Sequence, residues 1–313
     1  MLDVRRMRVL REVAACGSFS AAAESLSYTQ SAVSQQIAAL EREAGTTLVE
    51  RGARGVRMTD AGRALVEHAD VILARLDDAE AELEAISGLR SGRIRVVAFP
   101  SAGATLIPPA IARFRAAHPD IELSLRPGEP DEGLAMLRAG EADVALSIET
   151  PGSCSAPPEG IVLEPLLDDH MYAVLPVGHR LAARRRIRLE DLATESWIIG
   201  SSSGECPDAR IVLQACAAAG FEPDIAFQND DYQAIQGFIA AGVGVSLIPE
   251  LALATVRDDV VALSLGARAP YRRIVAATLA GGWESPAKVR MLEVLREIGD
   301  EFAGRRGELR LAS

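Results

Sequence analysis

The sequence predicts an α/β protein with an all-α amino-terminal part. Residues 3–44 carry apolar side chains at helical spacing, whereas from residue 93 onward short apolar segments alternate with helical ones. The chain has 313 residues with 49% apolar content, which is enough to bury substantial cores and is longer than one typical domain. We therefore expect two or three domains.

Charge is distributed unevenly along the chain. The formal net charge is −11, which by itself argues against a polyanionic partner. Residues 1–59, however, hold eight arginines and six acids, about +2, so the acidic excess lies in the remainder. A near-neutral first module precedes an acidic body.

Several classes of protein are disfavoured by simple counts. The arginine-rich start lacks the apolar region of a secretory signal, and no run of about 18 apolar residues predicts a membrane span, so we expect a cytoplasmic protein without membrane contact. The scattered histidines and cysteines lack metal-ligand spacing, and no metal or cofactor is expected. The cysteines are Cys16, Cys154, Cys206 and Cys216.

Three short helices are predicted at the amino terminus. The first spans residues 3–15 and ends at Gly17, Ser18 caps the second, and Thr29 caps the third, which ends at Gly45. The expected inward face of the first helix comprises Val4, Met7, Leu10, Arg11 and Ala14. That of the third comprises Val33, Ile37, Leu40 and Ala44. The order is helix, short turn, helix.

Uncharged polar side chains occupy the opposite face of the third helix near its amino end. They are Gln30, Ser31, Ser34 and Gln35, and no carboxylate occurs from residue 27 to residue 40. Amides and hydroxyls can reach base edges, and a helix amino terminus favours a phosphate. The alternative is that these residues only solvate an exposed helix.

Two short strands, at 47–50 and 56–59, are predicted to form a hairpin after this helix. Arg51, Arg54 and Arg57 cluster on it and could lie against phosphates or in the minor groove. Over residues 2–65 the chain resembles the winged helix-turn-helix of LysR-type transcriptional regulators, through "GSFSAAAESLSYTQSAVSQQIAALEREAGTTLVERGARGVRMTDAG". It departs at two positions, where the family often has proline and arginine in place of Ser31 and Gln35. The expected DNA-binding residues are Ser18, Thr29, Gln30, Ser31, Ser34, Gln35, Arg51, Arg54 and Arg57.

A long linker helix is predicted from 60 to 88, capped by Thr59 and Asp60. Its apolar residues recur at spacings of three, four and seven, as in a coiled-coil seam: Leu65, Ile72, Leu76, Ala79, Leu83 and Ile86. The seam predicts a homo-oligomer, and the resemblance implies a tetramer rather than a dimer; the alternative is packing on its own domain. We expect domains at 2–59, 60–92 and 93–303.

The rest of the chain predicts a mostly parallel sheet covered by helices, divided into lobe I (93–165 and 268–303) and lobe II (166–267). Strands are expected at 93–99, 121–126, 143–148, 161–165, 171–176, 196–199, 224–228, 244–248 and 273–279, and helices at 103–117, 131–139, 206–219, 231–241 and 286–303. Motifs such as "LRAGEADVALSI" and "FIAAGVGVSLIP" resemble the family's effector domain, which is similar to periplasmic binding proteins.

An effector site is expected where strands end and helices begin, between the lobes. The candidate residues are Ser101, Ala102, Ser147, Ser201, Ser202, Ser203 and Asp230. Hydroxyls and backbone amides could hold a small anion such as a carboxylate, although Asp230 would repel it. The alternative for any one serine is an ordinary helix cap.

The sequence therefore predicts a DNA-binding transcriptional regulator whose small-molecule effector binds between two α/β lobes, with RNA polymerase as a further candidate partner. No nucleophile elbow, phosphate loop or dinucleotide motif is present in the sequence, and we expect no enzyme activity. Two alternatives stay open. One is a solute-binding protein with an added amino-terminal domain, and the other is a redox-sensing regulator that uses Cys206 and Cys216.

Overall fold

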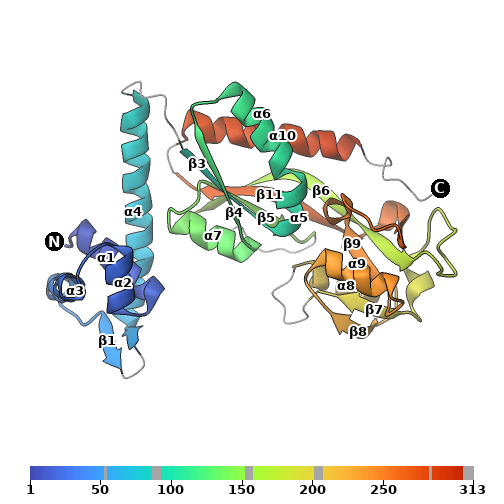
Figure 1. Ribbon diagram of the computed structural model, residues 1–313, viewed down its shortest axis with the longest axis horizontal. Helices are drawn as coiled ribbons and strands as arrows, with labels where there is room; N and C mark the ends of the chain where they lie inside the picture. The colour runs from blue at the N-terminus through green and yellow to red at the C-terminus, as the bar shows by residue number, and fades with distance from the viewer. Residues whose placement is uncertain (53–54, 87–92, 152–157, 201–206, 282–283, 306–313) are drawn as a thin grey trace. The chain divides into compact units, whose positions relative to one another are not determined.

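The computed structural model describes residues 1–52, 55–86, 93–151, 158–200, 207–281 and 284–305 (Figure 1). The chain forms two compact units. The first is built mainly from the residues up to the end of α4, and the second contains the α/β part.

Three helices begin the first unit: α1 (Val4–Cys16), α2 (Phe19–Ser25) and α3 (Gln30–Ala44). The ends of α1 and α3 are set by Gly17 and Gly45, whose φ angles of 60° and 70° are left-handed and cost glycine little. Between α2 and α3 the turn passes through Ser27, also left-handed at φ 55°. The predicted order of helix, turn and helix is confirmed.

The inward face of α3 is the predicted one, with Val33, Ile37 and Leu40 buried. The predicted face of α1 is partly wrong. Its buried residues are Met7, Val9, Leu10 and Val13. The apolar face of α1 is wide because α1 packs against α2, α3 and α4, so helical spacing alone placed the stripe incorrectly.

The predicted hairpin is present as β1 (Val49–Gly52) paired antiparallel with β2 (Gly55–Met58). Glu41 of α3 holds its base, because Oε1 accepts the backbone N–H groups of Leu48 at 2.9 Å and Val49 at 3.2 Å. This carboxylate fixes the position of the hairpin relative to the third helix.

The long helix α4 (Asp60–Ile86) begins where predicted, and the Thr59 hydroxyl accepts the Gly62 N–H at 2.9 Å. The first turns pack on the amino-terminal core through Ala61, Leu65, Val66 and Ala69. Farther along, Leu76 is 40% exposed and Leu83 is 66% exposed. Packing on its own domain therefore accounts for the start of this helix and leaves the later seam uncovered within the unit.

In the second unit, a sheet is formed by β4 (Glu122–Pro127), β3 (Arg93–Ala98), β5 (Val144–Glu149), β11 (Tyr271–Leu279) and the first half of β6 (Ile161–Pro176). β3 runs parallel to β4 and β5, whereas β11 is antiparallel to β5 and β6. The sheet is therefore mixed, and the prediction of a mostly parallel sheet is wrong for its later strands.

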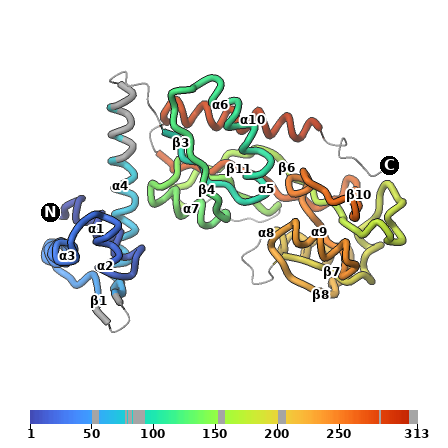
Figure 2. The backbone as a smooth tube through the Cα atoms, viewed as in Figure 1, coloured from blue at the N-terminus to red at the C-terminus, as the bar shows by residue number. Residues whose placement is uncertain are grey.

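The second half of β6 continues into another sheet region, where it pairs antiparallel with β9 (Ser246–Pro249) and β10 (Val260–Ser264). The prediction of separate strands at 161–165 and 171–176 is wrong, because one strand serves both regions, as the trace in Figure 2 shows. Beyond it, β7 (Ser196–Ile199) pairs parallel with β8 (Asp224–Gln228). Among the strands of the described residues, only β10 was missing from the prediction.

Helices cover the sheets. In Figure 1, α6 (Ile107–Ala117) and α10 (Pro286–Gly304) lie together over one face of the first sheet. The helix α7 (Pro130–Arg138) follows β4 in the chain. The short α5 (Pro100–Thr105) precedes α6. Near the second sheet lie α8 (Pro207–Ala218) and α9 (Tyr232–Ala240). Three short 3-10 turns occur at Leu189–Leu192, Glu250–Leu253 and Gly266–Arg268.

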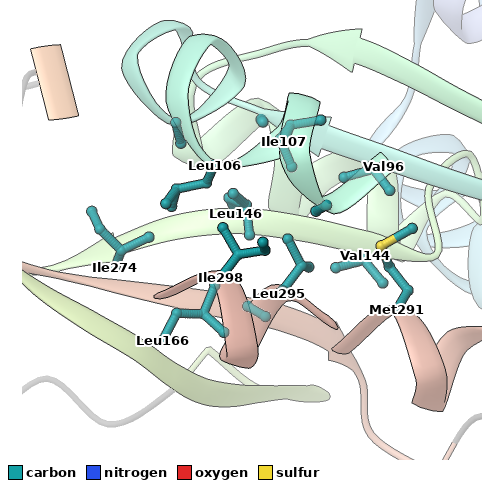
Figure 3. Close-up of a cluster of buried hydrophobic side chains, with 14 of the residues drawn as sticks. Val96, Leu106, Ile107, Val144, Leu146, Leu166, Ile274, Met291, Leu295 and Ile298 are labelled. Atoms are coloured by element: carbon teal, nitrogen blue, oxygen red, sulfur yellow. The ribbon is translucent and has the colours of Figure 1, made fainter. Parts of the chain in front are cut away.

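A continuous apolar core supports the first sheet. Leu295 and Ile298 of α10 pack with Leu106, Ile107 and the sheet residue Leu146 (Figure 3). Burial of such side chains stabilises the fold by roughly 1.5–3 kcal/mol each. Within the described part of the chain, no helix has the length and apolar character needed to cross a bilayer.

Candidate functional site

The amino end of α3 presents an uncharged polar surface. Gln30, Ser31 and Gln35 are exposed, and Ser34 is half-buried. The Thr29 hydroxyl caps the helix by accepting the Ala32 N–H at 3.2 Å. Other first-turn N–H groups are oriented along the helix axis and give this end partial positive charge. The surface combines hydrogen-bonding side chains with a terminus suited to an anion.

The side chains of two of the remaining predicted DNA-contacting residues, Ser18 and Arg57, are described by the structure. Ser18 caps α2 and accepts the Ser20 N–H at 3.2 Å, so its hydroxyl already has a structural task. Arg57 is exposed on β2, opposite Glu50 in the hairpin register. Arg54 and the side chain of Arg51 lie outside the described part of the structure.

The second unit contains a cavity of about 1160 Å³. Its walls come from the segments that follow strands and begin helices: Phe99–Ser101 after β3, Ser147–Thr150 at the end of β5, and the first residues of α7, α8 and α9. This is the position at which open α/β sheets bind ligands.

A buried arginine lies at the wall of the cavity. Arg272 of β11 is 1% exposed, and its guanidinium donates to Asp169 at 2.9 Å, to Asp208 at 2.7 Å and to the Ser101 hydroxyl at 2.7 Å. The Tyr232 hydroxyl also donates to Asp208. Arg272 thus connects β11 and β6 with the first turns of α5 and α8, and Asp208 extends the network to α9.

Arg272 and its two carboxylate partners shift one another's pKa. Burial lowers the pKa of Arg272, but the carboxylates of Asp208 and Asp169 outweigh that effect and hold the pKa above its ordinary value. Asp169 is fully buried; burial raises the pKa of its carboxyl, while Arg272 and the Leu251 N–H, at 3.1 Å, oppose the rise. Each of the three guanidinium nitrogens of Arg272 donates to a protein acceptor.

The structure brings three predicted effector residues to the cavity: Ser101, Ser147 and Asp230. The prediction for Ala102 is corrected, because Ala102 is fully buried in the apolar core beneath α5. A side chain one position from a pocket residue on a helix points about 100° away from it. Ser201, Ser202 and Ser203 lie outside the described residues.

Sequence reasoning missed Arg272, Asp169, Asp208, Tyr232 and Glu129. A signal was available for Arg272, because in the alternating strand β11 it shares the buried face with Ile274. A charged side chain on a buried strand face requires partners, and only the fold could show that two of them are acids from distant segments.

The structure describes only one of the two cysteines proposed for redox sensing. Cys216 is fully buried in the core of the second sheet, and burial raises its pKa to about 12. A thiol of this kind is a poor nucleophile. Cys206 lies outside the described residues. No three His, Cys, Asp or Glu side chains in the described part of the chain are grouped to hold a metal ion.

Together, the polar recognition surface and the ligand-sized cavity define a DNA-binding regulator with an effector-binding part. The family model for the bacterial regulatory helix-turn-helix protein of the lysR family matches residues 4–63, and the model for the LysR substrate binding domain matches residues 87–299. The chain belongs to the LysR family of transcriptional regulators. The family, the fold class and the regulatory function predicted from the sequence are confirmed.

The chain is similar to curated transcriptional regulators over most of their length. The chain is 31% identical over 96% of its length to the probable HTH-type transcriptional regulator LrrA of Synechococcus elongatus, covering 98% of that protein. It is 29% identical to the transcriptional dual regulator GltC of Bacillus subtilis, covering 80% of this chain and 81% of that one. A full-length OxyR variant from Pseudomonas aeruginosa has the same fold, with a TM-score of 0.75 at 22% identity over 99% of this chain and 96% of that one.

Proposed function

We propose that the amino half of α3 enters the major groove of operator DNA, with Gln30, Ser31, Ser34 and Gln35 facing base edges. Support comes from the outward position of Gln30, Ser31 and Gln35, and from the absence of acidic side chains between residues 27 and 40. Amides pair well with adenine, and hydroxyls can donate or accept. These side chains would set sequence preference.

The hairpin and the capping residues would position the protein without reading sequence. Arg57, with Arg51 and Arg54, would contact phosphates or the minor groove, while Ser18 and Thr29 would direct helix amino ends toward phosphates. The observation that supports this is the exposed position of Arg57 on a hairpin held to α3 by Glu41. Such contacts should make binding strongly dependent on salt concentration.

We further propose that the protein is a homo-oligomer, joined along the later part of α4. Ile72, Leu76 and Leu83 are 37%, 40% and 66% exposed and recur at coiled-coil spacing. A dimer would present two recognition helices to two half-sites about one turn of DNA apart or a multiple of it, and a tetramer four. The domains would be those expected from the sequence, 2–59, 60–92 and 93–303.

The effector would bind in the 1160 Å³ cavity. For the effector to alter transcription, it must favour one arrangement of the recognition modules over another, because a ligand shifts an equilibrium only by its differential affinity. The cavity and the network around Arg272 support this proposal, since both involve the two sheet regions of the second unit.

The test is a gel-shift assay with the DNA upstream of the protein's own gene. We expect a sequence-preferring complex whose affinity falls by roughly a thousandfold between about 50 and about 200 mM salt, because several phosphate contacts release bound counterions. Binding without preference between upstream and scrambled DNA would contradict the proposal. Footprints repeated with ligands that bind the second unit would then test the coupling.

A further inference from the structure

The effector cavity is strongly acidic. Its described lining contains seven carboxylates and two guanidiniums, a formal excess of five negative charges, and neither lysine nor histidine occurs among those residues. The charged lining residues are Glu129, Asp131, Glu132, Glu149, Asp208, Asp230, Asp231, Arg210 and Arg272. Some carboxylates have structural tasks: Asp231 caps α9, and Glu132 accepts the Glu129 N–H at 2.9 Å.

The buried arginine does not offset this excess. Arg272 is already paired with Asp169 and Asp208, and the three side chains together carry a formal charge of −1. The ring of Phe99 also lies under the guanidinium, 5.2 Å from its carbon to the ring centroid. An anionic ligand that displaced one of these carboxylates would break a buried ion pair, which is costly.

Asp208 lines the cavity and has one buried carboxylate oxygen without a hydrogen-bond partner among the described residues. The residue is 8% exposed, its Oδ2 atom accepts from Arg272 and Tyr232, and its Oδ1 atom has no hydrogen-bond partner among the described residues. A buried acceptor without a partner destabilises the protein, and a donor from a ligand would remove that penalty. Asp208 also borders a second cavity of about 20 Å³, large enough for one water molecule.

Carboxylates from distant segments of the chain line the cavity together. Glu129 precedes α7 and Asp230 precedes α9. Burial, followed by repulsion from Glu132, Asp208 and Asp230, raises the pKa of Glu129. These charges are therefore close enough to repel, and a cation between them would relieve that repulsion.

From this charge balance we infer that the effector is an organic cation, carrying an ammonium or guanidinium group that lies between Glu129 and Asp208 or Asp230. This rests on the proposed function of the cavity. The apolar lining residues Phe99, Leu134 and Leu251 would contact the body of such a ligand. The cavity is far larger than a metal ion, and the described residues form no cluster suited to one. This inference differs from the small anion, such as a carboxylate, that the serines led us to expect.

The test compares probes of similar length and opposite charge on the full chain by isothermal titration at low ionic strength. The cationic probes are putrescine and agmatine, the anionic probes are succinate and glutarate, and magnesium chloride is a third arm. We expect the cations to bind at least about tenfold more tightly than the anions. Each exposed ion pair raises the affinity by up to about fivefold, and a cation can pair with more than one carboxylate.

Two double variants test whether cation binding depends on the carboxylates of the cavity. Glu129→Gln with Asp230→Asn should weaken cation binding by about fivefold per carboxylate removed. The control, Glu222→Gln with Asp258→Asn, removes two exposed carboxylates that do not line the cavity and should leave binding unchanged. Equal losses in the two double variants would overturn the inference.

The inference is also overturned if succinate binds as tightly as putrescine, if neither charge class binds, or if magnesium binds more tightly than the amines. Its failure is distinguishable from that of the proposed function. An anion that binds in the cavity and alters the operator complex would leave the effector site intact and refute only the charge class. Loss of operator preference in the gel shift would refute the proposed function whatever the titration shows.

Discussion

Arg272 and Asp208 form an ion pair of 2.7 Å between β11 and the first turn of α8. Arg272 also binds Asp169 and Ser101, so one guanidinium joins three partners that are 64, 103 and 171 residues away from it in the chain. The neighbouring residue Arg273 makes a comparable pair with Asp168, but at the surface. Comparing these two adjacent arginines therefore distinguishes the effect on stability of burying an ion pair from the effect of forming one.

Replacing Arg272 with methionine should lower the free energy of unfolding by about 3–5 kcal/mol, because it leaves Asp169 and Asp208 buried without their cation. Arg273→Met is the matched control and should cost about 0–1 kcal/mol, since Arg273 and Asp168 are 41% and 35% exposed. Urea unfolding followed by circular dichroism measures both values. Equal losses would show that burial of the first pair has no energetic consequence.

Replacing Gln30 and Ser34 together with alanine should reduce the preference for operator over scrambled DNA by about 1–3 kcal/mol and leave non-specific binding nearly unchanged. The reason is that these side chains are proposed to face bases rather than phosphates. Gln214→Ala, an exposed site on α8, is the control. Competition gel shifts give the ratio, and an unaltered ratio would refute the recognition role of this helix face.

Replacing Arg57 with alanine should weaken binding to all DNA sequences to a similar degree and reduce the slope of log affinity against log salt by about 1. One phosphate contact would be lost while base contacts remain. The control is Arg115→Ala, an exposed arginine on α6. Fluorescence anisotropy over a salt series measures the slope. A change confined to the operator sequence would instead indicate base readout by Arg57.

Introducing glutamate at Leu76 and Leu83 should weaken self-association without unfolding the monomer, because both side chains are exposed on α4. Charges at a coiled-coil seam repel across the interface and must be desolvated there. Val289→Glu places the same charge at an exposed site on α10. Sedimentation velocity should show a smaller species only for the α4 variant; an unchanged assembly would place the interface elsewhere.

Cys216 should resist alkylation in the folded protein. Its pKa of about 12 leaves almost no thiolate at pH 8, whereas the unfolded chain, with an ordinary value of 9.0, forms appreciable thiolate. Because the folded-state pKa is raised, this thiol's contribution to stability is complete below pH 9 and is lost as pH rises toward 12. Iodoacetamide labelling with mass spectrometry, in buffer and in urea, tests this. Rapid labelling of Cys216 in buffer would revive the redox alternative.

The sequence by itself determined the local elements and the family. Capping residues and glycines placed the three amino-terminal helices, and uncharged side chains at Gln30 and Ser34 marked the surface that we propose for DNA recognition. These signals act within a few residues. Local signals also predicted the limits of β7 and β8, which agree with those in the structure.

Only the tertiary structure decided how distant segments combine. It showed that β6 is one strand shared by two sheet regions, that α1 is enclosed by three helices, and that Ala102 lies in the core. It also joined Arg272 to Asp169 and Asp208, and gathered the acids that give the cavity its charge. Strand pairing and buried ion pairs depend on contacts between residues remote in sequence, and no local pattern records them.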